Sequence, residues 1–324
     1  MSVRLNFVKQ QRNEAFLSCI DEIERAFKKN QNASVHTYYS KSNFLKNVFS
    51  RLVFRLPNIA FKIAFLRGQK KDASFAALMG LTFDFLLPRF YLSRCNYVYM
   101  FDAWPRFHHL IVKHAEFLNI RIIFFSSREV TRRFNKFQLK VKGFWIPEGI
   151  DVNEYLWYGY NNKDIDVLEF GRKYDFYHAL IREKLKDSGK VHLYEVKKGE
   201  VIFKTNEEFL KGLARSKITI CVPSNVTHPE RSEDISTMTL RYLQSMASKC
   251  LIVGIMPEEM KELFNYTPII EIDLNDPAGQ LIDLLNNFDS FIPLIEKNHE
   301  EVKSFHTWGI RTEKMLEIIR DDCA

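Results

Sequence analysis

The chain has 324 residues, of which 46% are hydrophobic and 27% charged, the proportions of an ordinary globular protein. These values exclude an intrinsically disordered or collagen-like chain, and the length favours two domains, because single cores rarely grow this large. The 47 basic and 40 acidic side chains give a net charge of +7. Residues 1–160 hold 25 of the basic and 12 of the acidic ones, so a basic half (+13) precedes an acidic half (−6).

The glycines and cysteines exclude several common kinds of site. Only 12 residues are glycine, none lies before Gly68, and neither a G-x-G-x-x-G motif nor a P-loop occurs. The cysteines are odd in number, widely spaced and form no C-x-x-C pair, which argues against a disulfide framework or zinc knuckle. This usage favours a reducing, cytoplasmic location; the residues are Cys19, Cys95, Cys221, Cys250 and Cys323.

The sequence also shows no membrane-targeting or membrane-spanning segment. The first residues are polar without an apolar stretch behind them, so we expect no signal peptide. No uncharged apolar run reaches the length of about 18 residues that a spanning helix needs. The nearest run, Phe75–Leu87, contains Asp84 and stops at Pro88, and it predicts a buried helix.

Apolar runs and helical patterns alternate along residues 1–160. The predicted strands cover Arg4–Val8, Ser34–Tyr39, Tyr97–Phe101, Arg121–Phe125 and Gly143–Pro147. The predicted helices cover Gln11–Lys29, Phe44–Lys71 with a break at Pro57, Pro105–Leu118 and a segment from Arg128. Strands that alternate with helices indicate a parallel sheet.

The pattern restarts after the polar stretch Asn161–Asp164, a predicted linker. The second set of strands covers Ile165–Phe170, Val191–Tyr194, Ile218–Val222, Cys250–Val253 and Ile269–Ile272. Helices are predicted from Tyr174, over Asn206–Ala214, Ser236–Ser248 and Pro257–Phe264, and at the C-terminus. We therefore predict two doubly wound α/β domains, residues 1–160 and 161–324, with ligands at the carboxyl ends of strands and a cleft between the domains.

Several motifs in this order are similar to those of a known family. Ser216–Phe264 contains a strand ending in Pro-Ser, a polar loop, a helix opening with small hydroxyl residues and a short Leu-Ile-Val strand. This segment resembles the donor-binding part of GT-B glycosyltransferases, in the family-four and spore-maturation-like groups. The same family has counterparts of Trp145–Asp151, Leu168–Arg172 and His306–Trp308, so the resemblance covers roughly residues 95–320.

The resemblance implies two Rossmann-like domains with different tasks. Residues 161–324 would bind a nucleotide-sugar donor as co-substrate, without a resident cofactor, and residues 1–160 would bind the acceptor. One position departs from the family, which usually has a Glu that holds the donor ribose where this chain has Gln244. The earlier Glu of the usual pair falls near Ser236. An amide still forms a hydrogen bond to a hydroxyl but brings no charge, so retention and inversion of configuration both stay open.

The start of the helix at Ser236 predicts a diphosphate site. An enzyme without a metal must neutralise its leaving group with cations and helix N-termini. Arg provides bidentate geometry for a phosphate. The candidates are the hydroxyls of Ser236, Thr237 and Thr239 with Arg241, and, after the first strand of this domain, Gly171, Arg172 and Lys173. Alternatively, the hydroxyls only cap the helix and Arg241 lies on a solvated face.

The loop after the strand at Ile218–Val222 adds further candidates. Ser224, Asn225 and His228 could contact the sugar or the diphosphate, or they could form an ordinary polar loop. Acidic residues in the same loop have no metal-ligand spacing, so we expect no tightly bound metal; they are Glu230, Glu233 and Asp234.

A general base is predicted in the first half. Transfer of a sugar to a hydroxyl benefits from such a base, and Asp102 ends an apolar strand, where α/β enzymes place active-site residues. His108 and His109 follow it. Alternatively, Asp102 caps the helix that starts at Pro105, and the histidines lie on the surface of that helix.

The segment Phe44–Lys71 is basic and amphipathic. It has seven Lys or Arg, no acid, and interleaved Phe, Leu, Ile and Val. Such a segment can lie on an anionic membrane, or pack its apolar face in the core while the Lys stems reach solvent.

These observations together predict a cytoplasmic, metal-independent glycosyltransferase, peripheral on the inner face of the membrane, that uses a glycan or lipid-linked acceptor in surface polysaccharide biosynthesis. Three alternatives stay open: a DNA-modifying glycosyltransferase, a non-catalytic nucleotide-sugar or glycan-binding protein, and a nucleotide-sugar epimerase of the same fold. Nucleic acid is the less favoured partner, because the excess charge of the whole chain is modest.

Overall fold

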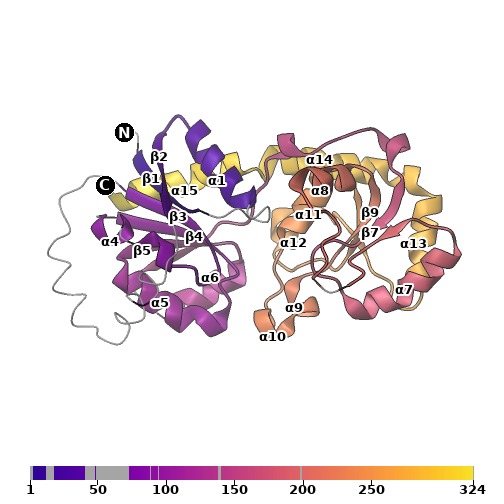
Figure 1. Cartoon of the computed structure of the whole chain (residues 1–324), viewed down its shortest axis with the longest axis horizontal. Helices are drawn as coiled ribbons and strands as arrows, with labels where there is room; N and C mark the ends of the chain where they lie inside the picture. Colours follow the sequence, from indigo (N-terminus) through magenta and orange to yellow (C-terminus); the bar gives the residue numbers. More distant parts are fainter. Residues whose placement is uncertain are drawn as a thin grey trace. The chain divides into compact units, whose positions relative to one another are not determined.

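The computed structural model describes residues 3–11, 18–40, 48, 73–87, 89–93, 95–137, 140–197 and 199–323. The predicted segment Phe44–Lys71 lies outside these residues, apart from Val48. The chain forms two compact units: unit 1 comprises residues 1–147 and 308–324, and unit 2 comprises residues 148–307 (Figure 1). This corrects the predicted boundary at 160. Divided in this way, the sequence has 28 basic and 13 acidic residues in unit 1 (+15), and 19 and 27 in unit 2 (−8).

Unit 1 is built on a parallel sheet of six described strands. Their order is β2-β1-β3-β4-β5-β6, and they are β1 Val3–Gln10, β2 Ala33–Ser40, β3 Ala73–Met79, β4 Cys95–Phe101, β5 Ile120–Phe125 and β6 Lys142–Trp145. The helices are α1 Ser18–Lys29, α4 Arg89–Leu92, α5 His108–Phe117, α6 Arg128–Asn135 and α15 Trp308–Cys323. The chain leaves β1 to one side, for β2, and continues on the other side from β3. The carboxyl ends of β1 and β3 therefore form a topological switch point, where ligands of such sheets bind.

The prediction of a buried helix over Phe75–Leu87 is wrong. The first residues of this run belong to β3, in which six consecutive side chains are buried, and a 3-10 turn follows at Asp84–Leu86. A central strand covered on both faces is a continuous hydrophobic run, which periodicity cannot separate from a buried helix. Gly80, with φ of +62°, ends the strand.

The last helix returns to unit 1. The ring of Trp308 lies edge-on to Tyr99 at a centroid distance of 5.4 Å. Near the other end of α15, Asp322 accepts a hydrogen bond of 2.8 Å from the Tyr97 hydroxyl and pairs with Arg121 at 2.9 Å. Contacts to β4 and β5 thus hold a segment that follows unit 2 in the sequence.

Unit 2 has a parallel sheet of five described strands in the order β11-β10-β9-β7-β8. They are β7 Ile165–Leu168, β8 His192–Leu193, β9 Ser216–Cys221, β10 Leu251–Gly254 and β11 Ile270–Glu271. Its helices are α7 Asp175–Asp187, α8 Asn206–Ala214, α9 Ser224–Thr227, α10 Pro229–Ser232, α11 Leu240–Ala247, α12 Met260–Leu263, α13 Pro277–Asn286 and α14 Ile292–Phe305. Here the switch point lies between β7 and β9.

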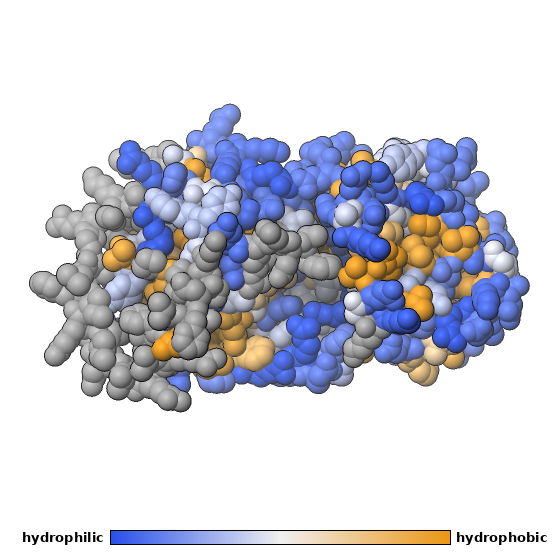
Figure 2. All heavy atoms as spheres, in the orientation of Figure 1, coloured by the Kyte–Doolittle hydropathy of each residue, from blue (hydrophilic) through white to orange (hydrophobic). Residues whose placement is uncertain are grey.

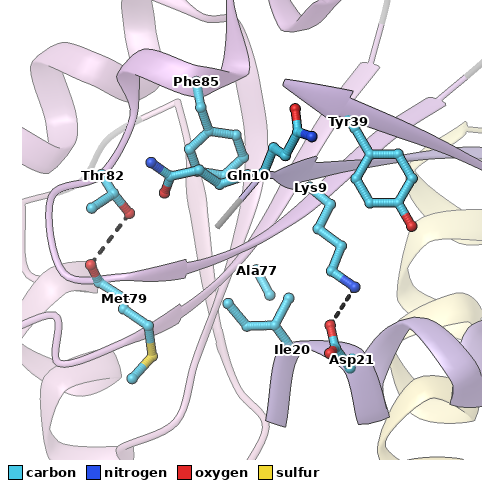
Figure 3. Close-up of a pocket in the computed structure, with 10 residues that line it drawn as sticks. Lys9, Gln10, Ile20, Asp21, Tyr39, Ala77, Met79, Thr82 and Phe85 are labelled. Atoms are coloured by element: carbon cyan, nitrogen blue, oxygen red, sulfur yellow. Dashed lines mark hydrogen bonds and ion pairs between the residues drawn. The ribbon is translucent and has the colours of Figure 1, made fainter. Parts of the chain in front are cut away.

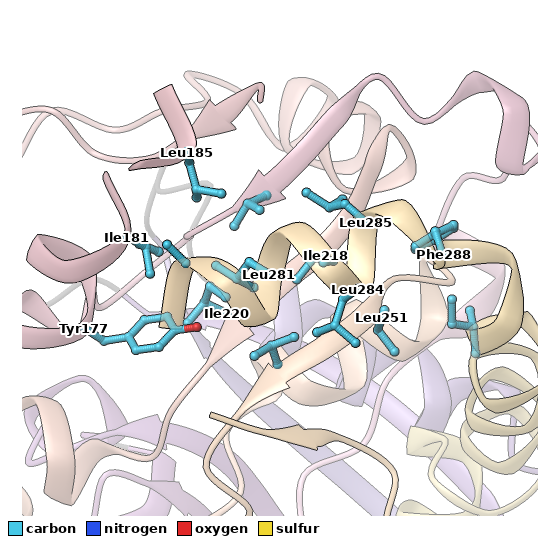
Figure 4. Packing of buried hydrophobic residues seen from close by; sticks show 14 residues of the cluster. Tyr177, Ile181, Leu185, Ile218, Ile220, Leu251, Leu281, Leu284, Leu285 and Phe288 are labelled. Carbon is cyan, nitrogen blue, oxygen red and sulfur yellow. The ribbon is translucent and has the colours of Figure 1, made fainter. Parts of the chain in front are cut away.

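One face of this sheet packs against α7 and α13 (Figure 4). Tyr177 and Ile181 from α7 and Leu281 from α13 meet Ile218 and Leu251 from the strands, and all five side chains are fully buried. Burial of such side chains contributes about 1.5–3 kcal/mol each. The framework behind the β7 and β9 loops is therefore a packed core.

The polar stretch Asn161–Asp164 is not a linker, because it lies inside unit 2. Lys163 is only 3% exposed. Its Nζ donates hydrogen bonds to the carbonyls of Ala214 (3.2 Å), Ser216 (2.8 Å) and Ser248 (3.2 Å). Burial lowers the pKa of this ammonium group.

In the described residues, none of the helices combines the length and the apolar character that crossing a bilayer requires. Figure 2 shows a mostly hydrophilic surface on the face drawn, with hydrophobic atoms gathered mainly over unit 2.

Candidate functional site

The predicted donor residues gather at the switch point of unit 2. The loop after β7 contains Gly171 and Arg172, and the segment after β9 contains Ser224. Nη1 of Arg172 donates a hydrogen bond of 2.7 Å to the Ser224 hydroxyl, which joins the two loops. The structure thus brings together residues that are 52 positions apart in the sequence. Parallel strands made this juxtaposition predictable, because their carboxyl ends meet at one edge.

Arg241, at the start of α11, fastens the same loops from beneath. The side chain is buried, and its guanidinium donates to the carbonyls of Arg172 (2.8 Å) and Val222 (2.7 Å), with a longer bond to Phe170 (3.5 Å). Arg241 therefore acts on the backbone of the loops. The alternative of a solvated face is therefore wrong for Arg241. Its contact with a phosphate stays a prediction.

Gly171 lets its loop approach Arg241 closely. Its φ is +70°, a region that L side chains rarely adopt, and an added Cβ would lie 3.1 Å from Cδ of Arg241. Gly171 itself is exposed and Arg172 is half-buried. The backbone of Gly171 and the guanidinium of Arg172 are thus accessible to solvent, while Arg241 holds the loop from the protein side.

The helix predicted to start at Ser236 begins instead at Leu240. The preceding residues are held by Glu259, which lies just before α12: its carboxylate accepts bonds of 2.5 Å from the Thr237 hydroxyl and 2.6 Å from the Met238 N–H. Ser236 and Thr237 therefore lie outside the helix, and Thr239 is its N-cap without a capping bond from the side chain. Sequence reasoning missed Glu259, although the acidic pair Glu258-Glu259 in the loop that follows β10 is a usable signal.

The remaining donor candidates lie around these loops. The Lys173 side chain is directed to the segment after β8, where its Nζ donates to the Glu195 carbonyl at 3.1 Å. Gln244 is buried on α11, one turn after Arg241. Asn225 is half-buried, and its Oδ1 has no hydrogen-bond partner in the described part of the chain. His228 follows α9, and its N–H donates to the Ser224 carbonyl at 2.7 Å.

A buried polar cluster that we did not predict lies just below the first loop. Glu169 follows β7, His178 is on α7 and His192 on β8. Oε1 of Glu169 lies 2.6 Å from Nδ1 of His178 and 2.8 Å from Nε2 of His192. Burial opposes ionisation of Glu169, but the hydrogen bonds from both imidazoles hold its pKa below the usual value.

Two histidines and a carboxylate are also a ligand set that suits zinc or another transition metal. In the described residues, this group is the one whose donor atoms lie close enough together for a metal ion. We expected no tightly bound metal anywhere in the protein, on the evidence of the loop at Glu230–Asp234 alone; this cluster was not considered, and the expectation stays a prediction. The signal in the sequence was Glu169, an acidic residue inside the apolar run Ile165–Phe170 that was predicted as a strand.

In unit 1, Asp102 directly follows β4 and is half-buried. Its φ is +49°, which is uncommon for a residue other than glycine and often marks a functional position. The next two residues, Ala103 and Trp104, are buried, so the carboxyl end of β4 turns sharply beside the core.

His108 is a core residue. It is 1% exposed, its Nε2 lies 3.2 Å from the Ala103 carbonyl, and its ring packs on Phe134. Burial lowers its pKa to about 4, so the imidazole is neutral near pH 7. The alternative of a surface pair is thus wrong for His108 and holds only for the exposed His109. Packing and the carbonyl contact account for His108 without a catalytic role.

No protein-family model and no curated protein matches the sequence. Solved structures do match over nearly the whole chain. HepE of Anabaena, solved in complex with UDP and glucose, has a TM-score of 0.63 at 11% identity and covers 98% of this chain and 100% of its own. A glycosyltransferase of Rickettsia africae has 0.62 at 11% identity (99% and 98%), and sucrose-phosphate synthase of Thermosynechococcus elongatus has 0.61 at 9% identity (98% and 98%). The chain therefore has the GT-B fold that the resemblance predicted.

Proposed function

We propose that this protein is a glycosyltransferase that binds a nucleotide-sugar at the β7 and β9 loops of unit 2. The observation that carries the proposal is the fastening of these loops at the switch point by Arg172, Ser224 and Arg241. Two of the similar structures are by name a glycosyltransferase and a sucrose-phosphate synthase, and HepE was solved with UDP and glucose, which supports a nucleotide-sugar donor.

In the proposed reaction, the acceptor hydroxyl attacks the anomeric carbon of the donor and the nucleoside diphosphate leaves. The guanidinium of Arg172, beside the backbone of Gly171, would stabilise the negative charge of the diphosphate. Arg241 and Glu259 would keep the loops in place, so that little reorganisation accompanies the reaction. Asp102 of unit 1 is our candidate for the base that takes the hydroxyl proton. None of these roles requires a metal.

We further propose a glycan or lipid-linked acceptor, as in surface polysaccharide biosynthesis at the inner face of a membrane. The charge of +15 in unit 1 supports an acceptor with an anionic part, and the basic segment Phe44–Lys71 supports contact with anionic lipid. The same charge favours DNA as the second candidate acceptor, in which case binding would fall steeply with salt.

The first test is a thermal-shift screen of the full chain against UDP, GDP, CMP and ADP. A bound nucleotide raises the melting temperature, because it stabilises the folded state by mass action. We expect Arg172→Ala to remove the shift and the exposed Arg182→Ala, in the same unit, to keep it. If no nucleotide shifts the melting temperature, the proposed donor site is wrong.

The second test is sugar transfer. The nucleotide-sugar of the base that gives the shift is incubated with glycolipid or with DNA, and the labelled product is identified. Transfer to glycolipid supports the proposal, and transfer to DNA supports the second candidate. Nucleotide binding without any transfer or epimerisation would assign a binding protein, a role that Gln244 in place of the acidic residue favours.

A further inference from the structure

Unit 1 has a cavity of about 160 Å³ at its own switch point (Figure 3). The carboxyl ends of β1, β2 and β3 and the start of α1 line it. Its polar lining comes from two amides, two hydroxyl groups and one ion pair, namely Gln10, Gln11, Tyr39, Thr82, Lys9 and Asp21. This is the position in unit 1 that corresponds to the donor loops of unit 2.

The cavity has no net charge of its own. Among the residues that line it, the charged ones are Lys9 and Asp21, and they form an ion pair with each other. Lys9 also donates to Glu24 at 2.9 Å. The two carboxylates already neutralise the Lys9 ammonium. Lys9 therefore does not attract a phosphate or carboxylate ligand to the cavity. An anionic group would also have to be desolvated beside Asp21.

The rest of the lining suits a ring with both polar edges and an apolar face. Figure 3 shows the side chains of Tyr39 and Phe85 on different sides of the cavity, with Gln10 between them and Ile20 and Ala77 below. Amides and hydroxyls can donate to and accept from sugar hydroxyl groups, and aromatic faces cover the C–H groups of a sugar ring. The small volume restricts the ligand to about one ring.

Three of the elements that carry lining residues, β1, β3 and α1, are packed together by aromatic rings of the core. Phe27 of α1 packs edge-on against Phe75 of β3 with ring centroids 4.7 Å apart, and Phe7 of β1 lies 5.6 Å from Phe75. All three rings are fully buried. These three elements are therefore fixed relative to one another, which reduces the entropy that a ligand must lose on binding.

We propose that this cavity binds one uncharged sugar ring, the residue of the acceptor glycan that receives the new sugar. The inference rests on the proposed function and narrows it. The positive charge of unit 1 then serves another, anionic part of the acceptor, while recognition at the switch point is by neutral hydrogen bonds. An acidic sugar, such as a uronic acid, is excluded from this position by Asp21.

Saturation-transfer NMR on the full chain tests the proposal, with glucose, galactose, mannose and N-acetylglucosamine as neutral probes and glucuronate as the anionic one. We expect signal from at least one neutral sugar and none from glucuronate. Gln10→Leu should weaken the binding about tenfold, since it removes two or more hydrogen bonds. Gln31→Leu, the same change at an exposed position of unit 1, should leave it unaffected.

A second variant guards against misfolding. Ala77→Leu fills the cavity from β3 and should also abolish sugar binding, while circular dichroism reports whether either variant folds. Absence of binding by every neutral sugar, or stronger binding of glucuronate, would overturn the proposal. The nucleotide-induced thermal shift is measured on the same samples: if it persists while neutral sugars fail to bind, the cavity assignment falls and the donor site stands. If neutral sugars bind but no nucleotide shifts the melting temperature, the donor-site assignment is wrong and the cavity assignment stands.

Discussion

The two units share one sheet topology but differ in the side chains at its switch point. Each has a parallel sheet in which the chain reverses direction beside the first strand, at β1 and β3 in unit 1 and at β7 and β9 in unit 2. In unit 2 the loops at this point are fastened by Arg172 and Arg241, whereas in unit 1 they line an open cavity whose ion pair is internally neutral. The fold therefore gives each unit a ligand position, and the side chains decide which ligand fits.

The net charges of the units make the same point. Unit 1 has +15 and unit 2 has −8, yet the unit proposed to bind the more highly charged ligand is the acidic one. A few cations at the ends of two strands matter more for a diphosphate than the sum over the domain. The net charge of a unit describes its long-range attraction, which acts on encounter rather than on the fit at a site.

The largest effect is expected from Arg241→Ala, which removes the hydrogen bonds that hold the β7 and β9 loops of unit 2 together. The change leaves the carbonyls of Arg172 and Val222 buried without these donors, so the free energy of unfolding should fall by about 3 kcal/mol. The nucleotide-induced thermal shift should vanish as well. Urea unfolding gives the first quantity. Arg215→Ala removes an exposed pair with Asp164 and should cost less than about 1 kcal/mol; equal losses for both variants would argue against the assigned role.

The next effect concerns Glu259, which holds the segment before α11. Glu259→Gln replaces two charge-assisted hydrogen bonds by weaker ones, so we expect a loss of stability of about 2 kcal/mol and a raised KM for the donor. Steady-state kinetics with the active nucleotide-sugar measure the KM. The neighbouring Glu258→Gln affects only an exposed pair with Lys261 and should behave as wild type. An unchanged donor KM in Glu259→Gln would show that this segment does not position the donor.

The third prediction concerns pH and unit 1. The pKa of His108 is about 4 in the fold against about 6.5 when unfolded, so only the unfolded chain gains a proton in between. Its contribution is fully present above pH 6.5 and is lost as the pH falls toward 4. Stability should therefore decrease by about 1 to 2 kcal/mol between pH 7 and pH 5 from this residue. Urea unfolding at both pH values, with His108→Asn beside wild type, measures it; the same slope in the variant would contradict the assignment.

The sequence predicted the alternation of strands and helices well, because apolar runs and helical spacing are local signals. It also predicted that Gly171, Arg172, Ser224 and Arg241 would gather, since they follow strands whose carboxyl ends share an edge. Both successes need only periodicity and the topology of parallel sheets.

Apart from the strand β3, which periodicity could not separate from a buried helix, the failures share one physical cause: contact between residues far apart in the sequence. Lys163 looked like part of a linker because the three carbonyls that hold it come from distant loops. The start of α11 was misplaced because Glu259 ties down Thr237 from 22 positions away. The return of α15 to unit 1 depends on its contacts with β4 and β5. Side-chain patterns along the chain do not reveal such partners.

The smallest effect separates backbone strain from contact at the donor loop. Gly171 and Gly189 both have positive φ, +70° and +67°, but only Gly171 has a neighbour, Arg241, within reach of an added Cβ. Gly171→Ala and Gly189→Ala should each lose about 1 kcal/mol of stability, since both place an L side chain in the left-handed region. Only Gly171→Ala should also weaken nucleotide binding in the thermal-shift assay, because its Cβ must displace Arg241. If the two variants bind the nucleotide equally well, the close approach of Gly171 to Arg241 is not part of the donor site. The difference between the switch points of unit 2 and unit 1 would then rest on the Arg172–Ser224 hydrogen bond alone.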